Sequence, residues 1–475
     1  MNLIIKNGTL ITDSEQFKAD IFIQDGRIKQ VGLDMAVPSD TEIVDADGLL
    51  VMPGGVDVHT HLELPMFNTV SSDDHYTGHK AAAFGGTTTV MDFISQDDPD
   101  LIRCVDLWHK KADSKAAVDY SFHINITQFS SKILLQIPEL VDEGITSVKM
   151  FTAYNNRLRL GDGEIFQVMR VCREAGILPM VHAENGDVIE VLVAEALATG
   201  NTGPVWHART RPAWGAVESV LRAIALAVQA DSPLYVVHMN TAGGVEQLKL
   251  AREKGHPVFG ETCPPYLFFS EDDLAKEDGA KWICSPPMRS KADNDGVWQG
   301  LIDGTLQTIG TDHCPFFYDG TRGIQYEGKT VKIPGKELGK DNFTKIPNGL
   351  PGIGDRLPVM WTQGVGTGRL TPQQFVALNC TNPAKLFGIY PQKGCLLPGT
   401  DADIVLWNPE KEVEYGVKLA HHRTDYNLYV GWKLKGMPVQ VFLRGKMIVD
   451  HGRWLGRRGM GKFLKRKVFH PYGFG

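Results

Sequence analysis

The sequence predicts an α/β fold in which a (β/α)8 barrel is joined to a small β-sandwich domain that both ends of the chain build. Between residues 56 and 312, eight short β-rich segments alternate with segments of helical character, which is the element count of such a barrel. Five of the eight segments end in residues suited to a metal site, and only a closed ring of strands readily brings five strand ends together. A doubly wound open sheet, the competing architecture, is disfavoured for that reason.

Short alternating strands with turn dipeptides mark the two ends of the chain. Asn7-Gly8 and Asp25-Gly26 each lie between alternating apolar segments, and such dipeptides are the strongest short-range hairpin signal. The same pattern of short, strand-like apolar segments returns after residue 400. We therefore predict one discontinuous β-sandwich domain made of residues 1–53 and 389–450.

The barrel domain, residues 54–388, occupies the chain between those two halves. Its expected strands are 56–61, 87–93, 120–126, 146–151, 178–182, 234–238, 257–261 and 308–312. Its expected helices include 163–175, 188–198, 216–230 and 245–254. Residues 315–350, rich in Gly, Lys and Asp, are expected to form a loop over the active-site face. The basic residues 451–475 form an expected C-terminal tail that either reaches a neighbouring subunit or lies in solvent.

The composition argues against nucleic acid and membranes as partners and indicates a cytoplasmic location. The formal charge of −7 gives no sign of the basic surface that nucleic acid requires. The apolar runs fall far short of the roughly 20 residues of a membrane span, and Lys6 and Asn7 interrupt the apolar core that a signal peptide would need. The seven cysteines are odd in number and lack CxxC spacing, which is typical of a reduced, cytoplasmic protein.

His59 and His61 end the first expected strand of the barrel. Side chains two residues apart in a strand point the same way, so both imidazoles can reach one metal ion. His182 and His238 end the fifth and sixth strands and would bind a second ion, and Asp312 offers a carboxylate at the end of the eighth. One histidine at a strand end is more often a polar cap than a ligand, but this combination at five strand ends predicts a metal site.

Lys149 lies within the fourth expected strand, where an unpaired ammonium is costly to bury. Neighbouring metal cations would also repel it. A carbamate formed with CO2 would remove both problems, because it offers an anionic oxygen that can bridge two metals. The alternative is a lysine that extends past the strand end or pairs with a carboxylate, and the residues alone leave both interpretations open.

Eight motifs follow one another along the chain. They are Ile-Lys-Asn-Gly (5–8), Gly-Gly-Val-Asp-Val-His-Thr-His (54–61), Gly-Gly-Thr-Thr (85–88), Glu-Thr-Cys-Pro (261–264), Ser-Pro-Pro-Met-Arg (285–289), Thr-Asp-His-Cys (311–314), Lys-Ile-Pro-Asn-Gly (345–349) and Pro-Ala-Lys-Leu-Phe-Gly (383–388). Together with the order HxH, Lys, His, His, Asp, they resemble the cyclic amidohydrolases of the amidohydrolase superfamily, and most of all its dihydropyrimidinase/D-hydantoinase group. The resemblance runs nearly from end to end of the chain.

The resemblance implies a site with two divalent metal ions, usually Zn²⁺ with Mn²⁺ or Co²⁺ as alternatives, bridged by a carboxylated Lys149. It implies that Asp312 takes a proton from the attacking water and returns it to the leaving ring nitrogen. Tyr154 matches the tyrosine that hydrogen-bonds the developing oxyanion. Ser285 and Asn348 match positions whose main chain holds the amide edge of the substrate. A homotetramer is a further expectation from the family.

The residues that follow the second histidine bear on which ring the site accepts. Dihydroorotases carry an arginine two residues after that histidine, where it pairs with the substrate carboxylate, whereas this chain has Glu63. A carboxylate at that place would repel a charged substrate. Nearby apolar residues favour an uncharged ring with a small or hydrophobic 5-substituent: Leu62, Leu64, Met66, Phe67, Phe151 and Leu158.

We therefore expect a hydrolase that opens the cyclic amide bond of small neutral rings to give N-carbamoyl amino acids. Dihydrouracil, dihydrothymine and 5-substituted hydantoins are such rings. An allantoinase, or another cyclic ureide or imide hydrolase, is the alternative, although its ureido substrate calls for more polar loops. A non-catalytic dihydropyrimidinase-like assembly protein is disfavoured, because all six candidate metal ligands are intact.

Overall fold

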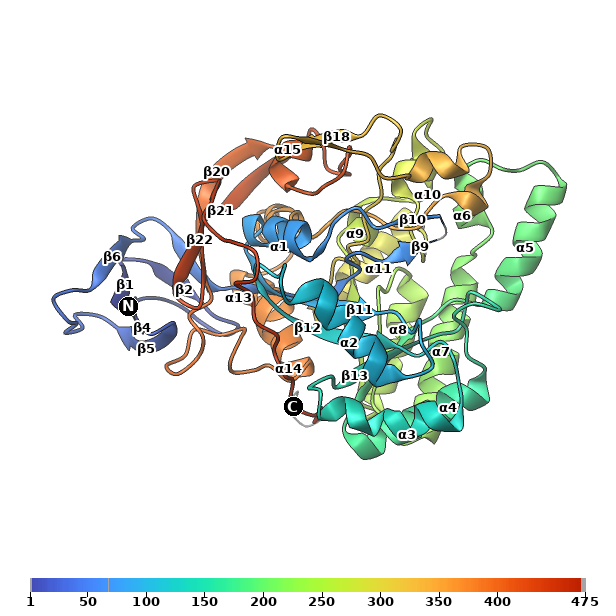
Figure 1. Cartoon of the computed structure of the whole chain (residues 1–475), viewed down its shortest axis with the longest axis horizontal. Helices are drawn as coiled ribbons and strands as arrows, with labels where there is room; N and C mark the ends of the chain where they lie inside the picture. Colours follow the sequence, from blue (N-terminus) through green and yellow to red (C-terminus); the bar gives the residue numbers. More distant parts are fainter. Residues whose placement is uncertain (1, 67, 471–475) are drawn as a thin grey trace.

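In the computed structural model, which describes residues 2–66 and 68–470, eight parallel strands form one sheet that curls into a barrel (Figure 1). A parallel bridge between Thr60 and His313 joins the first strand to the segment after the last one and closes the ring. The strands, in their order around the barrel, are β8 (Gly55–Thr60), β11 (Thr87–Ile94), β12 (Asp119–Asn125), β13 (Ser147–Phe151), β14 (Leu178–His182), β15 (Leu234–Val236), β16 (Val258–Thr262) and β17 (Thr308–Ile309).

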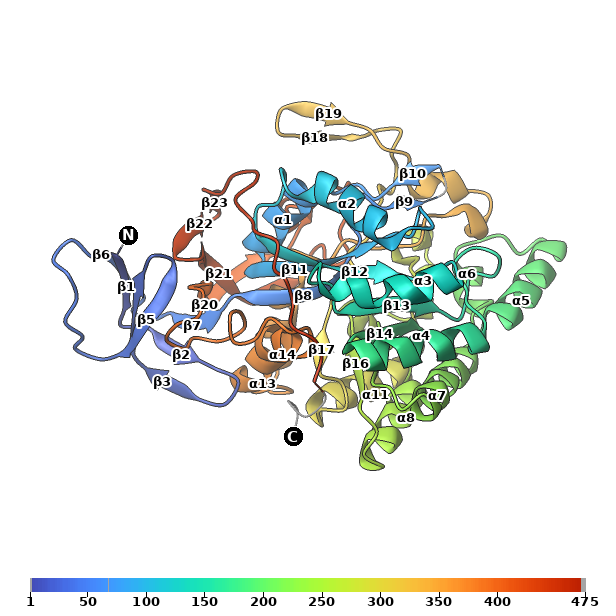
Figure 2. The same ribbon diagram turned by 60° about the horizontal axis from the view of Figure 1, so that its bottom comes forward.

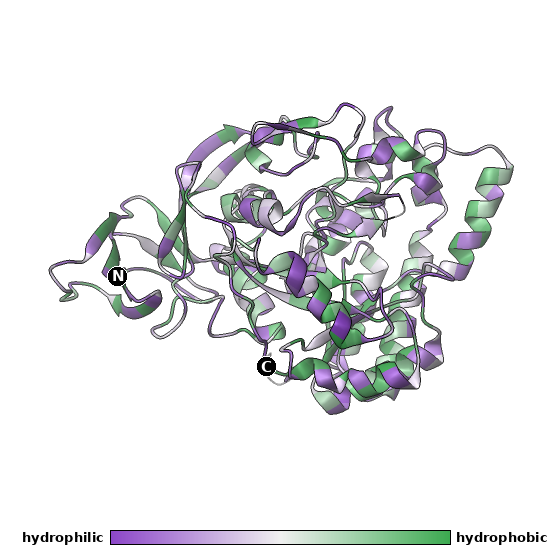
Figure 3. Cartoon of the chain, in the orientation of Figure 1, coloured by the Kyte–Doolittle hydropathy of each residue, from purple (hydrophilic) through white to green (hydrophobic). Residues whose placement is uncertain are grey.

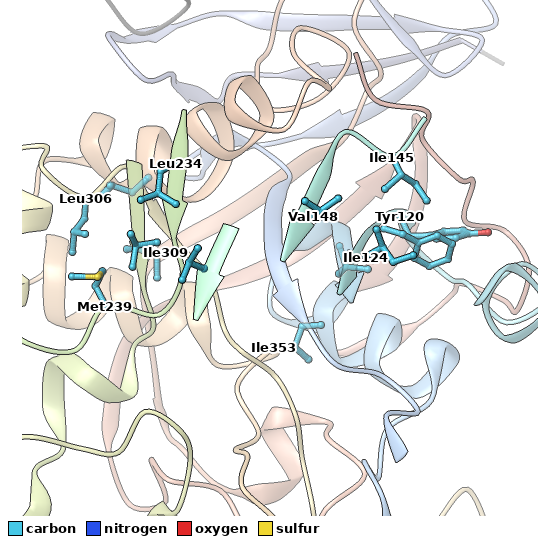
Figure 4. Close-up of a cluster of buried hydrophobic side chains, with 14 of the residues drawn as sticks. Tyr120, Ile124, Ile145, Val148, Leu234, Met239, Leu306, Ile309 and Ile353 are labelled. Atoms are coloured by element: carbon cyan, nitrogen blue, oxygen red, sulfur yellow. The ribbon is translucent and has the colours of Figure 1, made fainter. Parts of the chain in front are cut away.

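The strands of the barrel are buried along their whole length, as parallel strands covered on both faces should be. Every residue of β11 and of β12 is buried, for example. Outward-facing side chains pack beneath the helices in clusters on either side of the barrel (Figure 4): Tyr120, Ile124, Ile145 and Val148 on one side, and Leu234, Met239, Leu306 and Ile309 on the other. The parallel register brings the carboxyl ends of the strands to a single rim.

Helices follow most of the strands and surround the barrel. α4 (Asp162–Ala175) shows why: its buried residues Ile165, Val168, Met169 and Cys172 recur at helical spacing, and Gly176 ends it in a left-handed conformation with φ of 67°. The others are α1 (His75–Phe84), α2 (Leu101–Ala112), α3 (Ser131–Gln136), α5 (Gly186–Ala198), α6 (Val205–Arg209), α7 (Ala213–Gln229), α8 (Ala242–Glu253), α9 (Pro265–Phe268), α10 (Glu271–Leu274), α11 (Lys291–Ile302), α12 (Arg356–Met360), α13 (Pro372–Val376), α14 (Asn382–Leu386) and α15 (Val417–Ala420). Short 3₁₀ turns are η1 (Pro138–Val141), η2 (Gly279–Trp282), η3 (Lys336–Gly339) and η4 (Phe343–Lys345), and π turns are η5 (Trp361–Val365) and η6 (Ala377–Thr381). None of the helices in the described residues has the length and apolar character that crossing a membrane requires.

Strands from both ends of the chain build the smaller domain, which lies beside the barrel (Figure 1). One sheet has the order β5-β4-β1-β6 and the other β23-β22-β21-β20-β7-β2-β3. The first comprises β1 (Asn2–Lys6), β4 (Asp20–Gln24), β5 (Arg27–Gly32) and β6 (Glu42–Asp45). The second comprises β2 (Thr9–Ile11), β3 (Gln16–Lys18), β7 (Leu50–Pro53), β20 (Ile404–Glu414), β21 (Lys433–Leu443), β22 (Lys446–Asp450) and β23 (Arg453–Trp454). A barrel with an added β-sandwich is therefore confirmed as the fold class.

One of the two predicted hairpins is wrong. Asp25-Gly26 does turn between β4 and β5, with φ of 53° and 82°. At Asn7-Gly8, however, the chain passes from one sheet to the other, because β1 pairs with β4 and β6 whereas β2 pairs with β3 and β7. Gly8 is required there by close packing, since a Cβ atom would lie 2.3 Å from Cγ2 of Val51. A turn dipeptide marks a change of direction without specifying which strands pair.

The described part of the basic C-terminal tail lies along its own barrel, with several of its side chains exposed to solvent. The Leu464 amide donates to the Tyr120 carbonyl at 2.7 Å. Arg466 is 4% exposed and donates to the hydroxyls of Ser121 at 3.1 Å and Ser147 at 2.8 Å. These residues begin barrel strands, so the tail covers the amino-terminal end of the barrel, opposite the predicted site.

Residues 315–350 lie on the other side of the molecule and are more structured than a plain loop. They contain a hairpin of β18 (Ile324–Tyr326) and β19 (Lys329–Val331), which projects from the body in Figure 2. A second small hairpin, β9 (Pro65–Met66) with β10 (Thr69–Val70), lies near the same end of the barrel. The Thr69 hydroxyl donates to the Pro334 carbonyl and ties the two segments together.

Candidate active site

His59, His61 and Asp312 meet at the carboxyl-terminal rim of the barrel. Nε2 of His59 and Nε2 of His61 each lie 3.1 Å from Oδ1 of Asp312. One possible ligand atom from each of these three residues lies within 4.8 Å of those of the other two. Two imidazole nitrogens and a carboxylate oxygen are the donors that zinc-type sites use. The structure therefore brings these three residues together as the spacing predicts.

His182 and His238 form a second pair of donors beside the first. Nδ1 of His182 lies 2.9 Å from Nε2 of His238, and the rings of His238 and His59 stack with centroids 5.5 Å apart. Burial lowers the pKa of His61 to about 4, lowers that of His182 and holds that of His238 well below its ordinary value. Neutral imidazole is the form that binds a metal.

Lys149 lies between the two groups, with its side chain 2% exposed. Its Nζ atom is 3.1 Å from Nε2 of His59 and 4.3 Å and 5.3 Å from the ring centroids of Phe93 and Phe151. Within the described residues no carboxylate lies within ion-pair distance of it, although the charges of Asp312 and Glu261 act on it. Burial lowers the pKa of this amine.

Two buried carboxylates orient the histidines, and neither was predicted from the sequence. Glu261 contacts Nδ1 of His59, and Oε2 of Glu184 lies 3.0 Å from Nε2 of His182. Each carboxylate accepts from one ring nitrogen and leaves the other free to face the site, which is how residues behind a metal ligand fix its tautomer. Glu261 is itself held by the Tyr235 hydroxyl at 2.9 Å. The one signal available was position, since Glu261 ends an expected strand and Glu184 follows His182 by two residues.

Charge around Asp312 favours its ionised form. Burial alone would raise the pKa of this carboxyl, but His59 and His61 outweigh burial and hold the pKa well below its usual range. For His59, burial and Lys149 lower the pKa, yet the nearby carboxylates raise it overall. Asp312 is thus an anion placed to bind a cation or to accept a proton.

Three site residues have left-handed backbone conformations that non-glycine residues seldom adopt. The φ angles are 41° at His238, 50° at Asp312 and 67° at Tyr154. Each such conformation is costly and persists only where the surrounding structure imposes it, which is common at functional sites.

A cavity of about 400 Å³ opens above these donors. A volume of this order holds a small ring rather than a polymer. It is lined by His61, Leu64, Pro65, Met66, Ser95, Gln96, Asp97, Asn125, Thr127, Gln128, Lys149, Phe151, Tyr154, Arg157, Leu158, His182, His238, Ser285, Asp312, Cys314, Asn348 and Gly349. All the predicted donors except His59 therefore line this pocket, whose walls combine polar and apolar residues.

Tyr154, Ser285 and Asn348 all line this cavity, as the resemblance implies. The ring centroid of Tyr154 lies 5.2 Å from that of His182. Burial and the charge of Glu184 raise the pKa of Tyr154, so its phenol is protonated at neutral pH and can donate. Nδ2 of Asn348 donates to the Ser285 hydroxyl at 3.1 Å, which joins the two loops at the cavity wall.

Two expectations about the segment after His61 are corrected. Leu62 is fully buried and does not line the cavity, because it faces α1, where its Cδ2 would lie 2.5 Å from a Cβ at Gly78. Glu63 has φ of 51° and turns its carboxylate away to Lys115 at 2.6 Å. Its charge is paired outside the cavity, so direct repulsion of a charged substrate by Glu63 is not supported. Leu64 and Phe151 do line the cavity, and Phe67 lies outside the described residues.

Comparison with known proteins places this geometry in a family. Residues 50–448 match the amidohydrolase family. The chain is 42% identical over 473 residues to a D-hydantoinase of Geobacillus stearothermophilus, with 99% of this chain and 97% of the relative covered. A solved dihydropyrimidinase of Brevibacillus agri superimposes with a TM-score of 0.94 at 43% identity, covering 99% of this chain and all of the other. An L-hydantoinase of Arthrobacter aurescens gives a TM-score of 0.87 at 29% identity, covering 98% of this chain and 100% of that one. The chain therefore belongs to the amidohydrolase family.

Proposed function

We propose that this chain is a binuclear-metal hydrolase that opens the cyclic amide bond of neutral five- and six-membered rings. Its substrates would be 5,6-dihydropyrimidines and 5-substituted hydantoins, and its products N-carbamoyl amino acids. The observation that carries the proposal is that His61, Asp312 and the His182–His238 pair line a cavity of about 400 Å³, while the buried His59 contacts Asp312. The D-hydantoinase and dihydropyrimidinase relatives support the choice of reaction.

The family implies a binuclear divalent metal centre, and the residues present fit one. His59, His61 and Asp312 would hold the first ion, and His182 and His238 the second, since their free nitrogens face one another. The nitrogen-rich donor set favours zinc, with Mn²⁺ or Co²⁺ as alternatives. When bound, two such cations would supply a water-derived nucleophile near neutral pH and polarise the ring carbonyl.

Lys149 would provide the remaining ligand after reaction with CO2. The neutral amine forms a new N–C bond to the carbon of CO2 and releases one proton to solvent, which yields an anionic carbamate. Two observations support this modification: the amine is buried beside Nε2 of His59, and no carboxylate in the described part of the chain pairs with it. The carbamate would supply anionic oxygen donors to the metal centre.

Asp312 and Tyr154 would perform the proton and charge steps. Asp312 is ionised, so it can take a proton from the attacking water and later deliver it to the leaving ring nitrogen. Tyr154 retains its proton and lines the cavity, so it can donate to the oxygen that gains negative charge as the carbonyl is attacked.

The walls of the cavity support a neutral ring. Main-chain groups at Ser285 and Asn348 would hold its amide edge, and apolar side chains including Leu64 and Phe151 would contact the 5-substituent. Because the backbone makes the polar contacts, the side chains of Ser285 and Asn348 should tolerate replacement better than the metal ligands do.

A homotetramer in a reducing, cytoplasmic compartment completes the proposal. Large apolar side chains lie exposed on α5 and α7: Val191 is 58%, Leu221 51% and Trp214 78% exposed. Much of α5 is coloured as hydrophobic in Figure 3. Exposed apolar surface of this kind is typical of subunit contacts. All seven cysteines lie in the described residues as free thiols. Sedimentation analysis of V191D and W214E, compared with the unaltered chain, tests the assembly and should show smaller species.

The experiment that tests the function combines metal analysis with product formation. The chain is produced with zinc and bicarbonate, its metal content is measured, and N-carbamoyl product is followed with dihydrouracil and hydantoin. We expect two metal ions per chain and turnover of both rings, loss of both properties in H61N, and neither loss in H256N, which alters a histidine at the opposite end of the barrel. A chain without stoichiometric metal, or a metal-loaded chain inert toward every neutral ring, contradicts the proposal.

A further inference from the structure

Lys336 is a buried lysine whose amine contacts carbonyl groups of two separate loops. Its side chain is 1% exposed, and Nζ donates to the Ile283 carbonyl at 2.9 Å and to the Pro347 carbonyl at 3.1 Å. No carboxylate in the described part of the chain pairs with it. Burial lowers the pKa of this amine to about 7. A buried amine without a counter-ion is costly, so it calls for an explanation.

The two carbonyls lie next to the cavity wall. Ile283 is two residues before Ser285, and Pro347 immediately precedes Asn348, the two positions proposed to hold the substrate through the main chain. The Ile283 carbonyl also accepts the Gly349 amide at 3.1 Å. One carbonyl oxygen thus receives both Lys336 and Gly349, and the amine links the two loops directly behind the surface that faces the ring.

The backbone around Lys336 is built to place it there. The Lys336 amide donates to the Phe317 carbonyl at 2.7 Å, and a Cβ at Gly335 would lie only 2.0 Å from that same oxygen. The Glu337 carboxylate accepts the Gly335 amide at 3.0 Å. The start of η3 is therefore fastened to the segment after Asp312, and the lysine is directed inward from it.

We propose that Lys336 is a positioning residue that holds the Ser285 and Asn348 loops at the separation that binds the amide edge of the substrate. This inference rests on the proposed function, and it adds a residue outside the metal centre that sets substrate affinity. The amine satisfies the buried Pro347 carbonyl and adds a second donor to the Ile283 carbonyl, so one group reaches both loops at once. Its removal should loosen both loops while leaving the metal ligands in place.

The variant K336M tests this assignment, because methionine keeps most of the buried volume and removes the donors. The matched control is K345M, which alters an exposed lysine in the same segment. Metal content, kcat and KM are measured with dihydrouracil on the zinc-loaded chain. We expect K336M to raise KM at least tenfold with kcat within threefold of the unaltered chain and two metals retained, because the loops bind ground state and transition state alike. K345M should match the unaltered chain in all three quantities.

Other outcomes are decisive. A K336M variant with KM within threefold of the unaltered chain overturns the assignment, as does one whose kcat and metal content fall together. If K336M does not fold, K336R takes its place: its forked group cannot give both carbonyls the same geometry, so KM should rise with metal and kcat retained, and an unchanged KM overturns the assignment. An unaltered chain that binds metal but opens no neutral ring refutes the proposed function itself, whereas active unaltered chain with an unaffected K336M refutes only the role of Lys336.

Discussion

Nδ1 of His182 lies 2.9 Å from Nε2 of His238, and the two residues come from neighbouring strand ends of the barrel. The other nitrogen of His182 is occupied by Glu184 at 3.0 Å, so the nitrogen that faces His238 is the free one. Burial keeps both imidazoles neutral by lowering their pKa values. Two neutral nitrogen donors that face each other in a buried site can bind one of the two proposed cations.

Lys149→Ala should lose metal and activity together. The substitution removes the anionic donor that a carbamate at Lys149 would supply to the two ions. Short carboxylic acids such as acetate or propionate should restore part of the activity by occupying the space. Metal analysis and turnover of dihydrouracil check this, with K433A, which alters an exposed lysine at the start of β21, as the control. Full metal content and full activity in K149A would show that Lys149 bridges nothing.

Glu261→Gln should lower the affinity of the site for zinc without abolishing zinc binding. The carboxylate contacts Nδ1 of His59 and accepts the Tyr235 hydroxyl at 2.9 Å, so its replacement disturbs the tautomer that presents Nε2 to the metal. Substitution of such a partner costs about 10- to 100-fold in metal affinity. Competition titration against a chromophoric chelator measures the change, and E253Q, on exposed α8, serves as control. Equal affinities in E261Q and the unaltered chain would refute the orienting role.

Tyr154→Phe should lower kcat rather than raise KM. The phenol is protonated and lines the cavity, so its hydrogen bond would strengthen as charge develops on the substrate oxygen. Removing one oxyanion donor costs about 10²- to 10³-fold in kcat. Steady-state kinetics with a 5-substituted hydantoin check this, and Y390F, remote from the cavity, should be unchanged. A fall of less than threefold in kcat for Y154F would mean that another group stabilises the oxyanion.

The free energy of unfolding should decrease as the pH falls from 6.5 toward 4, and His79 should contribute to that loss. Burial lowers the pKa of His79 from 6.5 to about 4. Between those values the unfolded chain binds a proton at this histidine and the folded chain does not, so stability is present above pH 6.5 and is lost as the pH decreases. The slope for one group approaches ~1.4 kcal/mol per pH unit.

The variant H79Q isolates this contribution. A glutamine oxygen can accept the amides of Ala117 and Val118, which now donate to Nδ1 of His79. Chemical denaturation at several pH values should give H79Q a shallower dependence between pH 4 and 6.5 than the unaltered chain at the same metal concentration. Identical slopes would show that His79 takes up no proton on unfolding.

Much of the fold could be predicted because it depends on local periodicity. The expected strand 178–182 matches β14, and the expected helix 163–175 begins one residue after α4 does. The strand pairing around Asn7-Gly8 could not be predicted, since β1 pairs with β4 and β6 rather than with β2, the next strand along the chain. The last barrel strand is also shorter than expected, since it ends at Ile309 rather than at Asp312.

The candidate site could likewise be predicted only in part. His59 and His61 share a face of β8, so alternation alone brings them to one metal. Alternation fails just after them, because the positive φ of Glu63 turns its side chain to Lys115 and lets Leu64 face the cavity. Glu261 and Glu184, the carboxylates that orient the histidines, were not predicted. Glu261 contacts a histidine of another strand, 202 residues away in sequence. Glu184 contacts His182 only because the chain turns after β14 ends at His182.

The most direct measurement is kcat/KM of the zinc-loaded chain on dihydrouracil, hydantoin, a bulky 5-substituted hydantoin, allantoin and dihydroorotate. Leu64, Met66, Phe151 and Leu158 make part of the cavity wall apolar, and two loops can hold a cyclic amide through their main chain, so the highest values should belong to dihydrouracil and the hydantoins. Dihydroorotate carries a carboxylate that this apolar part of the wall cannot pair, so it should be at least 100-fold poorer, where each tenfold corresponds to ~1.4 kcal/mol. Greatest activity on dihydroorotate, or none on any neutral ring, would contradict the proposed function.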